Sequence, residues 1–484
     1  MRAMGVLDFF RRGSNDRPVD GGRGHITELP RGGSDLGTVT LEDGRQVRFR
    51  AADCQGFAPA PFVEVYIDEV LGDRAVALAR PPEEMRPPAA TPQRAPTAPE
   101  EPTRPELEQA LLASPDDVES HLVLGDWLQG QGHPRGELIA LMHRLEQDPG
   151  RELLEELRAL LAGHRRALLG ELLDGVSDEA LAGALRLESG RVRLDLADGS
   201  LRTGWRLGFL RQARVAEAPR SESGGLEQLE ALIAHPSARL LEDLTLGLIS
   251  LDDPDYDGAL EILAAAGPRP ALRRLFIGDF VYPDEMEMSW TSIGDLSPLY
   301  PLYPELRELT LQAGDFTLGE IALPKLRSFE LRTGGLRREC IESACRASWP
   351  RLERLVLWLG DAGYGAEGTI NDLEPILAAE GLPQLRELGL MNCELTDEIC
   401  ERLPGAAVAG LIERLDLSMG TMSDAGARAL AAGREAFGRL ERLDVSMNYL
   451  TDAGVQALRG LCPSVIVGEQ QEGDEGERYV TVGE

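Results

Sequence analysis

An aliphatic triplet, Leu-x-x-Leu-x-Leu, recurs along the second half of the chain and restricts the possible folds more than any other feature. Eight clear copies start at Leu241, Leu272, Leu306, Leu326, Leu352, Leu385, Ile412 and Leu440. A degenerate copy starts at Leu210, and the steps between successive starts are 31, 31, 34, 20, 26, 33, 27 and 28 residues. Such a period is typical of repeat proteins, in which each unit packs only against its neighbours.

The spacing within the triplet predicts a short strand in every copy. The last two apolar positions are two residues apart, so they lie on one face of a strand. A strand with one apolar face cannot bury it alone, but stacked copies form a parallel sheet over a continuous core. In the last copies Ser423-Asp424 and Thr451-Asp452 follow the strand and predict a capped helix after it.

These triplets resemble leucine-rich repeats of the longer, ribonuclease-inhibitor-like type over residues 207–468. The resemblance implies an α/β solenoid with a curved parallel sheet and with helices on the convex side. That family usually has Asn or Cys at the turn after the strand. This chain has Cys393 and Asn448 there but Gly at positions 314, 334, 360 and 420, so we expect an incomplete polar ladder and irregular curvature.

Composition divides the rest of the chain into segments. Nine prolines in residues 81–105 predict an extended linker, because proline donates no backbone hydrogen bond to a helix or sheet. We predict a disordered N-terminus at 1–23, a small β-barrel at 24–80, the linker at 81–105, a helical domain at 106–170, a capping segment of the solenoid at 171–206, the repeats at 207–468 and an acidic tail at 469–484. For the tail, a disordered, solubilising role is the simplest account.

Five short strand patterns lie before the linker. An Asp43-Gly44 turn, for example, joins the alternating stretch Leu36–Leu41 to Gln46–Phe49. Their order resembles a cold-shock-type OB barrel, a family that stacks bases on aromatic side chains of its second strand. The matching stretch here, Ser34–Val39, has no aromatic residue. We therefore expect little nucleic-acid binding, and a nucleic-acid-associated regulator acting through this barrel is the alternative function.

The region after the linker has a helical pattern. Ser114–Asp117 is a helix start, with Ser114 as the cap and Pro at the first helical position, and this helix ends at Gly130. The run Leu111–Leu141, with Asp126-Trp127-Leu128 and Pro134-Arg135-Gly136-Glu137, resembles the bacterial repeat-companion domain, a helical module found beside repeat arrays. The resemblance implies an architectural role and no activity.

Nothing in the sequence points to catalysis or to a bound cofactor. The chain has no phosphate loop, His-Glu-x-x-His motif, Gly-x-Ser-x-Gly elbow or Cys-x-x-Cys pair. Lys325 is its one lysine, and the spacing of His121, His133 and His143 fits no zinc signature. We predict that the protein is not an enzyme and has no cofactor and no metal site.

Charge and cysteine content limit the partners and the compartment. The formal net charge of −32 disfavours nucleic acid and anionic membranes, because phosphate attracts clustered Lys and Arg. The sequence contains no run of about 18 apolar residues, so we expect no membrane span. The start of the chain has too short an apolar stretch for a signal peptide. Six cysteines without tight spacing suit a reducing compartment. We expect a cytoplasmic protein, and its arginine-rich composition is typical of a GC-rich bacterial genome.

Strand geometry predicts which side chains are exposed. The leucines of each triplet point inward, so the residues between them point to the concave face. Two inserted loops, Gly278–Ser297 and Gly360–Thr369, follow strands at one edge. We predict a partner-binding surface on the concave face and its rim, made of Phe276, Tyr282, Trp290, Glu308, Glu330, Arg332, Val356, Trp358, Tyr364 and Met391.

The sequence as a whole predicts a non-enzymatic scaffold that binds another protein through the solenoid. In this interpretation the helical domain caps or orients the repeats, and the barrel is a tethered accessory module. One alternative stays open for the large apolar side chains, in which the inserted loops fold over them. The identity of the partner and the oligomeric state do not follow from the sequence.

Overall fold

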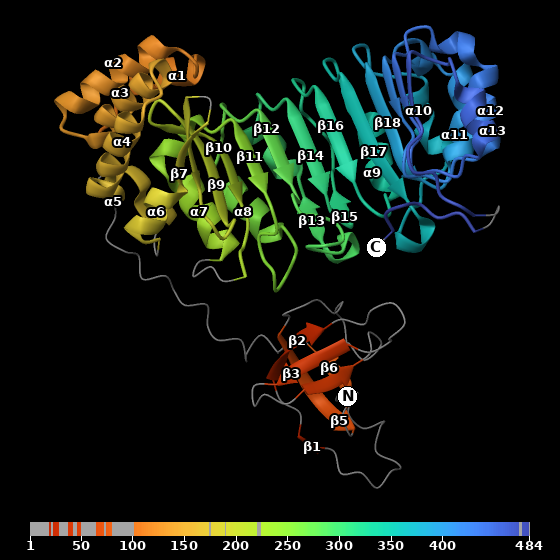
Figure 1. The fold of residues 1–484 in the computed structure, drawn as a ribbon, viewed down its shortest axis with the longest axis horizontal. Coiled ribbons are helices and arrows are strands. Elements are labelled where there is room, and N and C mark those ends of the chain that lie inside the picture. Colours follow the sequence, from red (N-terminus) through yellow and green to blue (C-terminus); the bar gives the residue numbers. More distant parts are fainter. Residues whose placement is uncertain are drawn as a thin grey trace, which may run out of the picture. The chain divides into compact units, whose positions relative to one another are not determined.

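The computed structural model describes residues 101–173, 176–188, 190–219, 224–473 and 477–483, together with the backbone of six strands between residues 19 and 79 (Figure 1). The chain forms two compact units, Met1–Ala95 with Leu251–Asp253, and Pro96–Ser250 with Pro254–Glu484. Most of the predicted N-terminal segment and most of the predicted linker lie outside the described residues.

The first unit contains the strands β1 (Val19–Asp20), β2 (Arg23–Glu28), β3 (Gly37–Leu41), β4 (Gln46–Phe49), β5 (Glu64–Leu71) and β6 (Arg74–Ala79). They pair in the order β1-β5-β2-β3-β4-β6, and β5 also pairs with β6. Among these described strands, β4 and β6 run parallel and the other pairs run antiparallel.

The second unit begins with the helices α1 (Pro105–Ala113), α2 (Val118–Gly130), α3 (Pro134–Gln147), α4 (Arg151–Gly163), α5 (Arg165–Leu169) and α6 (Asp178–Ala184). Helix α2 ends at Gly130, as predicted. The predicted cap is wrong, because Ser114 terminates α1 and the Asp117 carboxylate accepts the capping hydrogen bond from the Ser120 amide at 3.0 Å. Helices α2 and α3 approach closely, since a Cβ on Gly136 would overlap the backbone of α2.

Four antiparallel strands connect these helices to the repeats. They are β7 (Leu185–Glu188), β8 (Arg191–Asp195), β9 (Leu201–Arg206) and β10 (Phe209–Val215). Strand β10 then pairs in parallel with β11 (Asp243–Leu246), so one sheet runs from β7 through all the repeats (Figure 1). Residues of the predicted capping segment thus contribute strands to the sheet that they were expected to cap.

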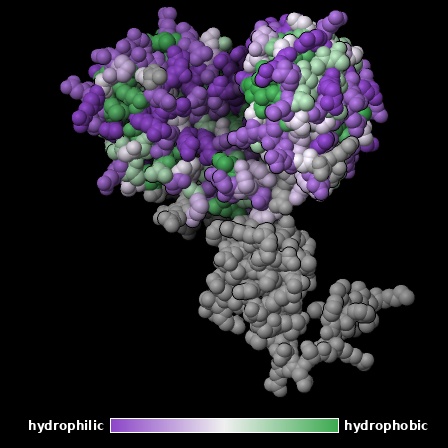
Figure 2. All heavy atoms as spheres, turned by 45° about the vertical axis from the view of Figure 1, so that its right-hand side comes forward, coloured by the Kyte–Doolittle hydropathy of each residue, from purple (hydrophilic) through white to green (hydrophobic). Residues whose placement is uncertain are grey.

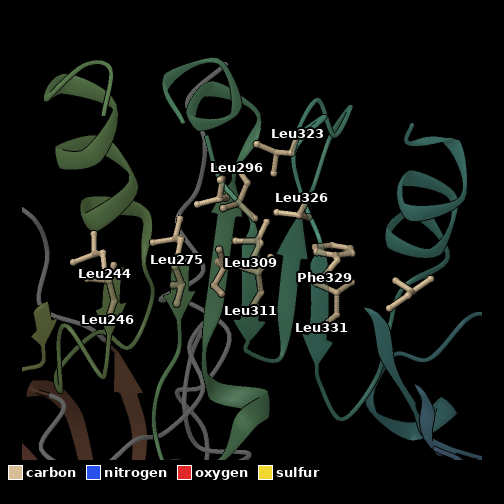
Figure 3. Packing of buried hydrophobic residues seen from close by; sticks show 14 of the residues in the cluster. Leu244, Leu246, Leu275, Leu296, Leu309, Leu311, Leu323, Leu326, Phe329 and Leu331 are labelled. Atoms are coloured by element: carbon tan, nitrogen blue, oxygen red, sulfur yellow. The ribbon is translucent and has the colours of Figure 1, made fainter. Parts of the chain in front are cut away.

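The sheet continues in parallel through β12 (Arg274–Ile277), β14 (Glu308–Gln312), β16 (Ser328–Arg332), β17 (Arg354–Gly360), β18 (Glu387–Cys393), β19 (Arg414–Asp416), β20 (Arg442–Asp444) and β21 (Ser464–Ile466). The register aligns Leu244, Leu275, Leu309, Phe329, Leu355, Leu388, Leu415 and Leu443 in one row. All of them are buried in one core (Figure 3). The prediction that the triplets form parallel strands over a continuous core is confirmed.

The connections between the strands hold the helices α7 (Gly225–Ala234), α8 (Asp257–Ala265), α9 (Arg338–Arg346), α10 (Glu374–Leu377), α11 (Thr396–Arg402), α12 (Asp424–Ala432) and α13 (Asp452–Leu458). Their apolar sides, for example Ala427 and Leu430 of α12, pack into the same core as the strand leucines. A second, two-stranded sheet pairs β13 (Ser292–Asp295) with β15 (Asp315–Thr317).

The aspartates that follow Thr or Ser in the last repeats connect one repeat to the next. The Asp397 carboxylate accepts hydrogen bonds from the Ser423 amide (2.8 Å), the Ser423 hydroxyl (2.5 Å) and the Gly426 amide (3.1 Å). Asp424 binds Thr451 of the following repeat in the same way. A Cβ on Gly426 would overlap Asp397, so this contact requires glycine there. Ser423 and Thr451 also cap α12 and α13, as predicted.

Glycine at the turn after a strand has a steric reason. A Cβ on Gly420 would overlap the Thr396 hydroxyl and would lie 3.2 Å from Oδ1 of Asn448. Asn448 is itself buried, and its Nδ2 donates to the Leu417 carbonyl (2.8 Å) while its Oδ1 accepts from the Met422 amide (2.9 Å). The Thr396 hydroxyl therefore occupies the space that a side chain at position 420 would need, and the fixed Asn448 side chain borders it.

Two further turn glycines are covered by other parts of the chain. A Cβ on Gly314 would lie 2.8 Å from Cα of Ser289 in the first inserted loop. A Cβ on Gly334 would overlap the backbone of Gly483 near the C-terminus. The polar ladder is therefore interrupted where another backbone crosses the turn.

The C-terminal residues 477–483 pack along the turns of the last repeats. The Thr481 amide donates to the Met419 carbonyl (3.0 Å), and Val482 and Asn392 exchange hydrogen bonds of 2.6 and 2.8 Å. The side chains of Val480 and Val482 are buried. The expectation of a disordered tail is wrong for these residues, because their alternating valines and backbone groups find partners on the repeats.

A buried ion cluster holds the helices on the sheet. Arg135 of α3 is fully buried, and its Nε donates to Glu101 at 2.6 Å. One Nη donates to the Gly208 carbonyl (2.7 Å) and the Ser237 hydroxyl (2.5 Å), and Arg239 binds the second oxygen of Glu101 at 2.7 Å. Burial raises the pKa of Glu101, but the two arginines outweigh it and hold this pKa below its usual value. The linker prediction is therefore wrong at its end, because Glu101 belongs to the packed unit.

Two His-Pro pairs start helical turns beside this cluster. Nδ1 of His133 accepts a hydrogen bond from the Arg135 amide (3.3 Å), and Nδ1 of His235 accepts one from the Ser237 amide (3.1 Å). An accepting ring nitrogen requires a neutral imidazole. Burial and the nearby Arg135 charge lower the pKa of His235 to about 4, so the imidazole stays neutral at pH 7.

Replacing Gly420 with Asn, a usual residue at this turn in leucine-rich repeats, should destabilise the protein. The new side chain would overlap Thr396, and overpacking typically costs about 1–3 kcal/mol. Urea unfolding should show this loss for Gly420→Asn but not for Gly405→Asn, since a Cβ on Gly405 meets no atom within 4 Å. Equal stabilities of the two variants would contradict the steric explanation.

The free energy of unfolding should fall as the pH decreases from about 6.5 towards 4. The unfolded chain protonates His235 near its ordinary pKa of about 6.5, whereas the folded protein resists protonation until about pH 4. This difference corresponds to at most about 3 kcal/mol. His235→Asn retains a capping oxygen without this titration, so urea unfolding at pH 7 and pH 5 should show a smaller decrease than in the wild type. His164→Gln, at an exposed position, is the matched control, and an unchanged decrease in His235→Asn would exclude His235 as the cause.

Candidate functional site

The open face of the main sheet, which is the face turned away from the leucine core, carries the side chains between the leucines. The register places one row at Asp243, Arg274, Glu308, Ser328, Arg354, Glu387, Arg414 and Arg442. A second row holds Thr245, Phe276, Thr310, Glu330, Val356, Gly389, Asp416 and Asp444. Side chains in a row are on adjacent strands, so they interact across the sheet.

A ladder of ion pairs crosses the middle of the open face. Glu330 binds Nε of Arg332 (2.7 Å) and Nη1 of Arg354 (2.6 Å). Arg354 continues to Glu387 (2.7 Å), which also binds Arg414 (2.7 Å). Burial raises the pKa of Glu330, but the hydrogen bonds and charges of Arg332 and Arg354 outweigh it and hold this pKa below its usual value. The ladder therefore fixes charged side chains in defined positions on the open face.

Two aromatic rings flank one arginine of this ladder. Cζ of Arg332 lies 5.4 Å from the ring centroid of Phe276 and 6.0 Å from that of Trp358. All three side chains are partly exposed, and a guanidinium within about 6 Å of an aromatic face is attracted by it. Met391 is the register partner of Trp358 on the next strand and is also partly exposed. We call Phe276, Arg332, Trp358 and Met391 the central cluster.

This grouping stands out from the ordinary surface of the protein. Among the described residues, the large hydrophobic side chains with high exposure are Val123, Val281, Tyr364 and Tyr479. They come from separate parts of the chain, and the face drawn in Figure 2 is mostly hydrophilic, with separate hydrophobic patches. Single exposed apolar residues are normal, whereas several together on a rigid sheet indicate a contact surface.

Four of the ten predicted binding residues thus form the central cluster. Val356 is in the same area, but it is 1% exposed and fills the space above Gly389, so the prediction that it is exposed is wrong. The predicted exposure of Glu330 is also wrong, because this residue is 7% exposed and its carboxylate is paired with Arg332 and Arg354. Glu308 is exposed, as predicted.

The other three predicted residues lie in the inserted loops. Tyr282 and Trp290 are partly buried in the first loop. Tyr364, in the second loop, is 42% exposed, and a Cβ on Gly483 would lie 2.7 Å from its ring. The C-terminal residues therefore border the part of the predicted rim that Tyr364 forms.

The first inserted loop is built into the fold. It buries Phe280, Met286 and Met288, and its Phe280 carbonyl accepts a hydrogen bond from Nε2 of Gln312 on β14 (2.8 Å). At its start, Asp279 binds Nε of Arg214 at 2.5 Å. The loop thus places its own apolar residues in the core, while Phe276 and Trp358 keep part of their surface exposed.

The last repeats place two carboxylates and two arginines on the open face. Asp416 and Asp444 are register partners, and their carboxylates accept hydrogen bonds from the hydroxyls of Ser418 (2.6 Å) and Ser446 (2.5 Å). Burial raises the pKa of Asp416, and the charge of Asp444 adds to this effect against the opposing Ser418 hydrogen bonds. Arg414 and Arg442 are register partners in the neighbouring row, and Arg442 lies 3.6 Å from Asp444, so the charges of these strands are paired within the protein.

The opposite end of the open face is basic, which the sequence analysis missed. Strands β7–β10 lie between Leu185 and Val215, a segment with seven arginines and three acidic residues. Because Val192, Leu194, Leu201 and Trp205 point into the core, alternation puts Arg191, Arg193, Arg202 and Arg206 on the open face. Alternation of Arg with apolar residues was the signal that could have revealed this end. It was missed because these strands lie before the first clear triplet, and only the degenerate copy falls on them.

The described residues offer no evident chemistry of their own. They contain no group of three or more His, Cys, Asp or Glu side chains that could hold a metal ion. Burial raises the pKa of both the Cys340 and Cys393 thiols to about 12, so they are protonated and unreactive at pH 7. The Cys393 sulfur accepts a hydrogen bond from the Leu395 amide (3.2 Å), which fits the predicted structural role at the turn. No helix in the described part of the chain has the length and apolar character needed to span a membrane.

The family model described as Leucine Rich repeat matches residues 411–431 and 440–458. The chain contains leucine-rich repeats. The matched residues cover β19, β20, most of α12 and all of α13, where Asp424 links two adjacent leucine-rich repeats. No curated protein sequence matches the chain.

Solved structures include two similar chains. A protein from Bacteroides fragilis is 25% identical, with 53% of this chain and 73% of that chain covered and a TM-score of 0.49. An internalin from Listeria monocytogenes is 17% identical, with 51% and 71% covered and a TM-score of 0.26. Both TM-scores are below 0.5, so these likenesses by themselves establish neither the fold nor the function of this chain.

Removing the charge of Glu330 should destabilise the leucine-rich repeats. Glu330→Gln leaves two partly buried arginines without their shared carboxylate, and losing hydrogen bonds to charged groups costs about 1–3 kcal/mol. Because the folded pKa of Glu330 is depressed, this stabilisation is present above about pH 4.5 and is lost as the pH falls below it. Urea unfolding should therefore separate Glu330→Gln from the wild type at pH 7 and much less at pH 3.5. Glu308→Gln, at an exposed position, is the control, and a loss as large in this variant would contradict a specific role of Glu330.

Proposed function

We propose that this protein is a non-enzymatic scaffold that binds another protein through the open face of its leucine-rich repeats. The observation that carries the proposal is the central cluster, in which Arg332 lies between the partly exposed rings of Phe276 and Trp358. Trp, Arg and other aromatic side chains in the middle of a surface are typical of binding hot spots. The other residues of the predicted surface belong to the proposal as its surroundings.

The way in which this surface is held supports the same function. Phe276, Arg332 and Trp358 are on strands of one sheet, and Glu330 fixes Arg332 through a 2.7 Å ion pair. Binding to a rigid surface loses little conformational entropy, so more of the contact energy becomes affinity. Nε1 of Trp358 is shielded from solvent and has no hydrogen-bond partner among the described residues.

Two further modules complete the proposal. Helices α1–α6, whose sequence resembles the repeat-companion domain, support the first strands of the sheet through Arg135. The N-terminal strands form an OB-like barrel in this proposal, because β5 pairs with both β2 and β6 and thereby closes the sheet. Nucleic-acid binding through that barrel is the less favoured function, since β3 (Gly37–Leu41) has no aromatic side chain on which a base could stack. We place the protein in the cytoplasm.

The proposal predicts that removing the two rings abolishes partner binding. Tagged wild type and the double variant Phe276→Ala/Trp358→Ala would be used to capture partners from cells of the source organism, with quantification by mass spectrometry. Hot-spot truncations typically cost about 2 kcal/mol or more each, so we expect the recovery of a specific partner to fall at least about 10-fold.

The matched control is Val123→Ala, a 47% exposed position on α2 that is remote in sequence from the central cluster. Urea unfolding and circular dichroism must show that all variants are folded. Unchanged recovery with the folded double variant would overturn the proposal. Loss of the partner with Val123→Ala instead would move the binding surface to the helices.

A further inference from the structure

A hollow lies at the basic end of the open face, outside the central cluster. It has a volume of about 380 Å³ over β8–β10 and is lined by Arg191, Arg193, Arg206, Arg211, Trp205, Gln212, Gly204 and one acidic side chain, Glu188. A Cβ on Gly204 would lie 2.8 Å from a guanidinium nitrogen of Arg193 and 3.1 Å from the Gln212 side-chain oxygen. The side chains of Arg193 and Gln212 therefore cross over Gly204, and a larger residue at this position would displace them.

Carboxylates from outside the hollow hold two of its arginines in place. Arg206 binds Asp116 (2.9 Å) and Glu146 (3.0 Å), both from the helical part of the chain. Arg211 binds the same oxygen of Asp116 (3.0 Å) and Glu242 (2.6 Å). The helices therefore orient guanidinium groups that line the hollow from the sheet.

Several guanidinium N–H groups of these arginines have no acceptor among the described residues. Nε of Arg211 is shielded from solvent and has no hydrogen-bond partner among the described residues, although Arg211 is nine-tenths buried. Arg191 is exposed, and no described residue forms an ion pair with it. Arg193 uses Nε for Glu188 (2.9 Å) and one Nη for Gln212 (2.7 Å), which leaves its other Nη available. Converging guanidinium donors are suited to a carboxylate or phosphate, which accepts two parallel hydrogen bonds.

We propose that this hollow binds an acidic peptide segment, and that this segment belongs to the protein partner of the open face. The inference rests on the proposed function. The register joins Gly204 to Gln212, Gln212 to Asp243 and Asp243 to Arg274, so the hollow lies on the same row as Arg274, two residues before Phe276 of the central cluster. Strand spacings of about 4.8 Å put about 15 Å between the ends of this row, well within one standard protein interface.

Nucleic acid matches the same surface poorly. A phosphate backbone requires a continuous basic track, but Glu308, Asp416 and Asp444 interrupt the open face, and the whole chain carries a net charge of −32. A short acidic peptide experiences mainly the nearby arginines, because ionic screening limits distant charges to about 8 Å at physiological salt.

Direct binding of a model peptide tests the proposal with the full chain. Fluorescein-labelled hexaglutamate should bind the wild type at physiological salt in fluorescence anisotropy, and a twelve-nucleotide single-stranded DNA should bind at least 10-fold more weakly. Arg191→Glu should weaken hexaglutamate binding at least 10-fold, whereas Arg351→Glu, the same change at an exposed position before β17, should leave it within about 2-fold. Gly204→Leu should block the hollow and give the same loss as Arg191→Glu in a variant that urea unfolding shows to be folded.

The outcomes separate this inference from the proposed function. Phe276→Ala/Trp358→Ala should keep hexaglutamate binding, because these residues lie outside the hollow. Absence of hexaglutamate binding, equal binding by Arg191→Glu, or tighter binding of the oligonucleotide would overturn the acidic-peptide site. Partner capture that depends on Trp358 but not on Arg191 would also overturn it while the scaffold function stands. Capture that depends on neither residue would overturn both.

Discussion

The structure depends on the burial of one apolar row per strand in a core that no single repeat could form. Leu275, Leu309 and Phe329 illustrate this, since each is on a different strand and all three are buried side by side. Burying a large apolar side chain contributes about 1.5–3 kcal/mol, and that gain exists only when neighbouring repeats are in register. The same constraint frees the opposite face of every strand, which is why charged and aromatic residues gather there without loss of the fold.

The junction between the helices and the sheet is stabilised in a different way. Arg135, Glu101 and Arg239 are buried together, and both guanidinium groups also lie within 5.3 Å of the centroid of the Phe209 ring. Buried ion pairs add little net stability compared with apolar packing, but they tolerate few alternative arrangements. Because Glu146 is in α3 and Asp116 is in the turn between α1 and α2, this fixed orientation also positions the arginines of the hollow.

Sequence reasoning succeeded where a pattern reports directly on geometry. The triplets gave the strands and their inward faces because alternation follows from the backbone alone, and the exposures of Phe276, Trp358 and Glu308 followed from it. It failed where the burial of a residue depends on a segment that is distant in the sequence. Val356 is covered because position 389 is glycine, and the end of the proline-rich segment is packed because Glu101 meets two arginines from elsewhere in the chain. The acidic composition of residues 469–484 likewise concealed the valines at 480 and 482. The basic end of the open face was accessible from alternation and was missed because it lies before the regular repeats.

Repeat arrays usually fray from their ends, since a terminal unit has one neighbour instead of two. Here the last residues run backwards over the array, from Tyr449 through Met419 and Asn392 to Gly334 at the end of β16. The terminal repeat is thereby tied to one that lies several strands further inward. The final repeats should consequently unfold together as a cooperative block and not one at a time from the end.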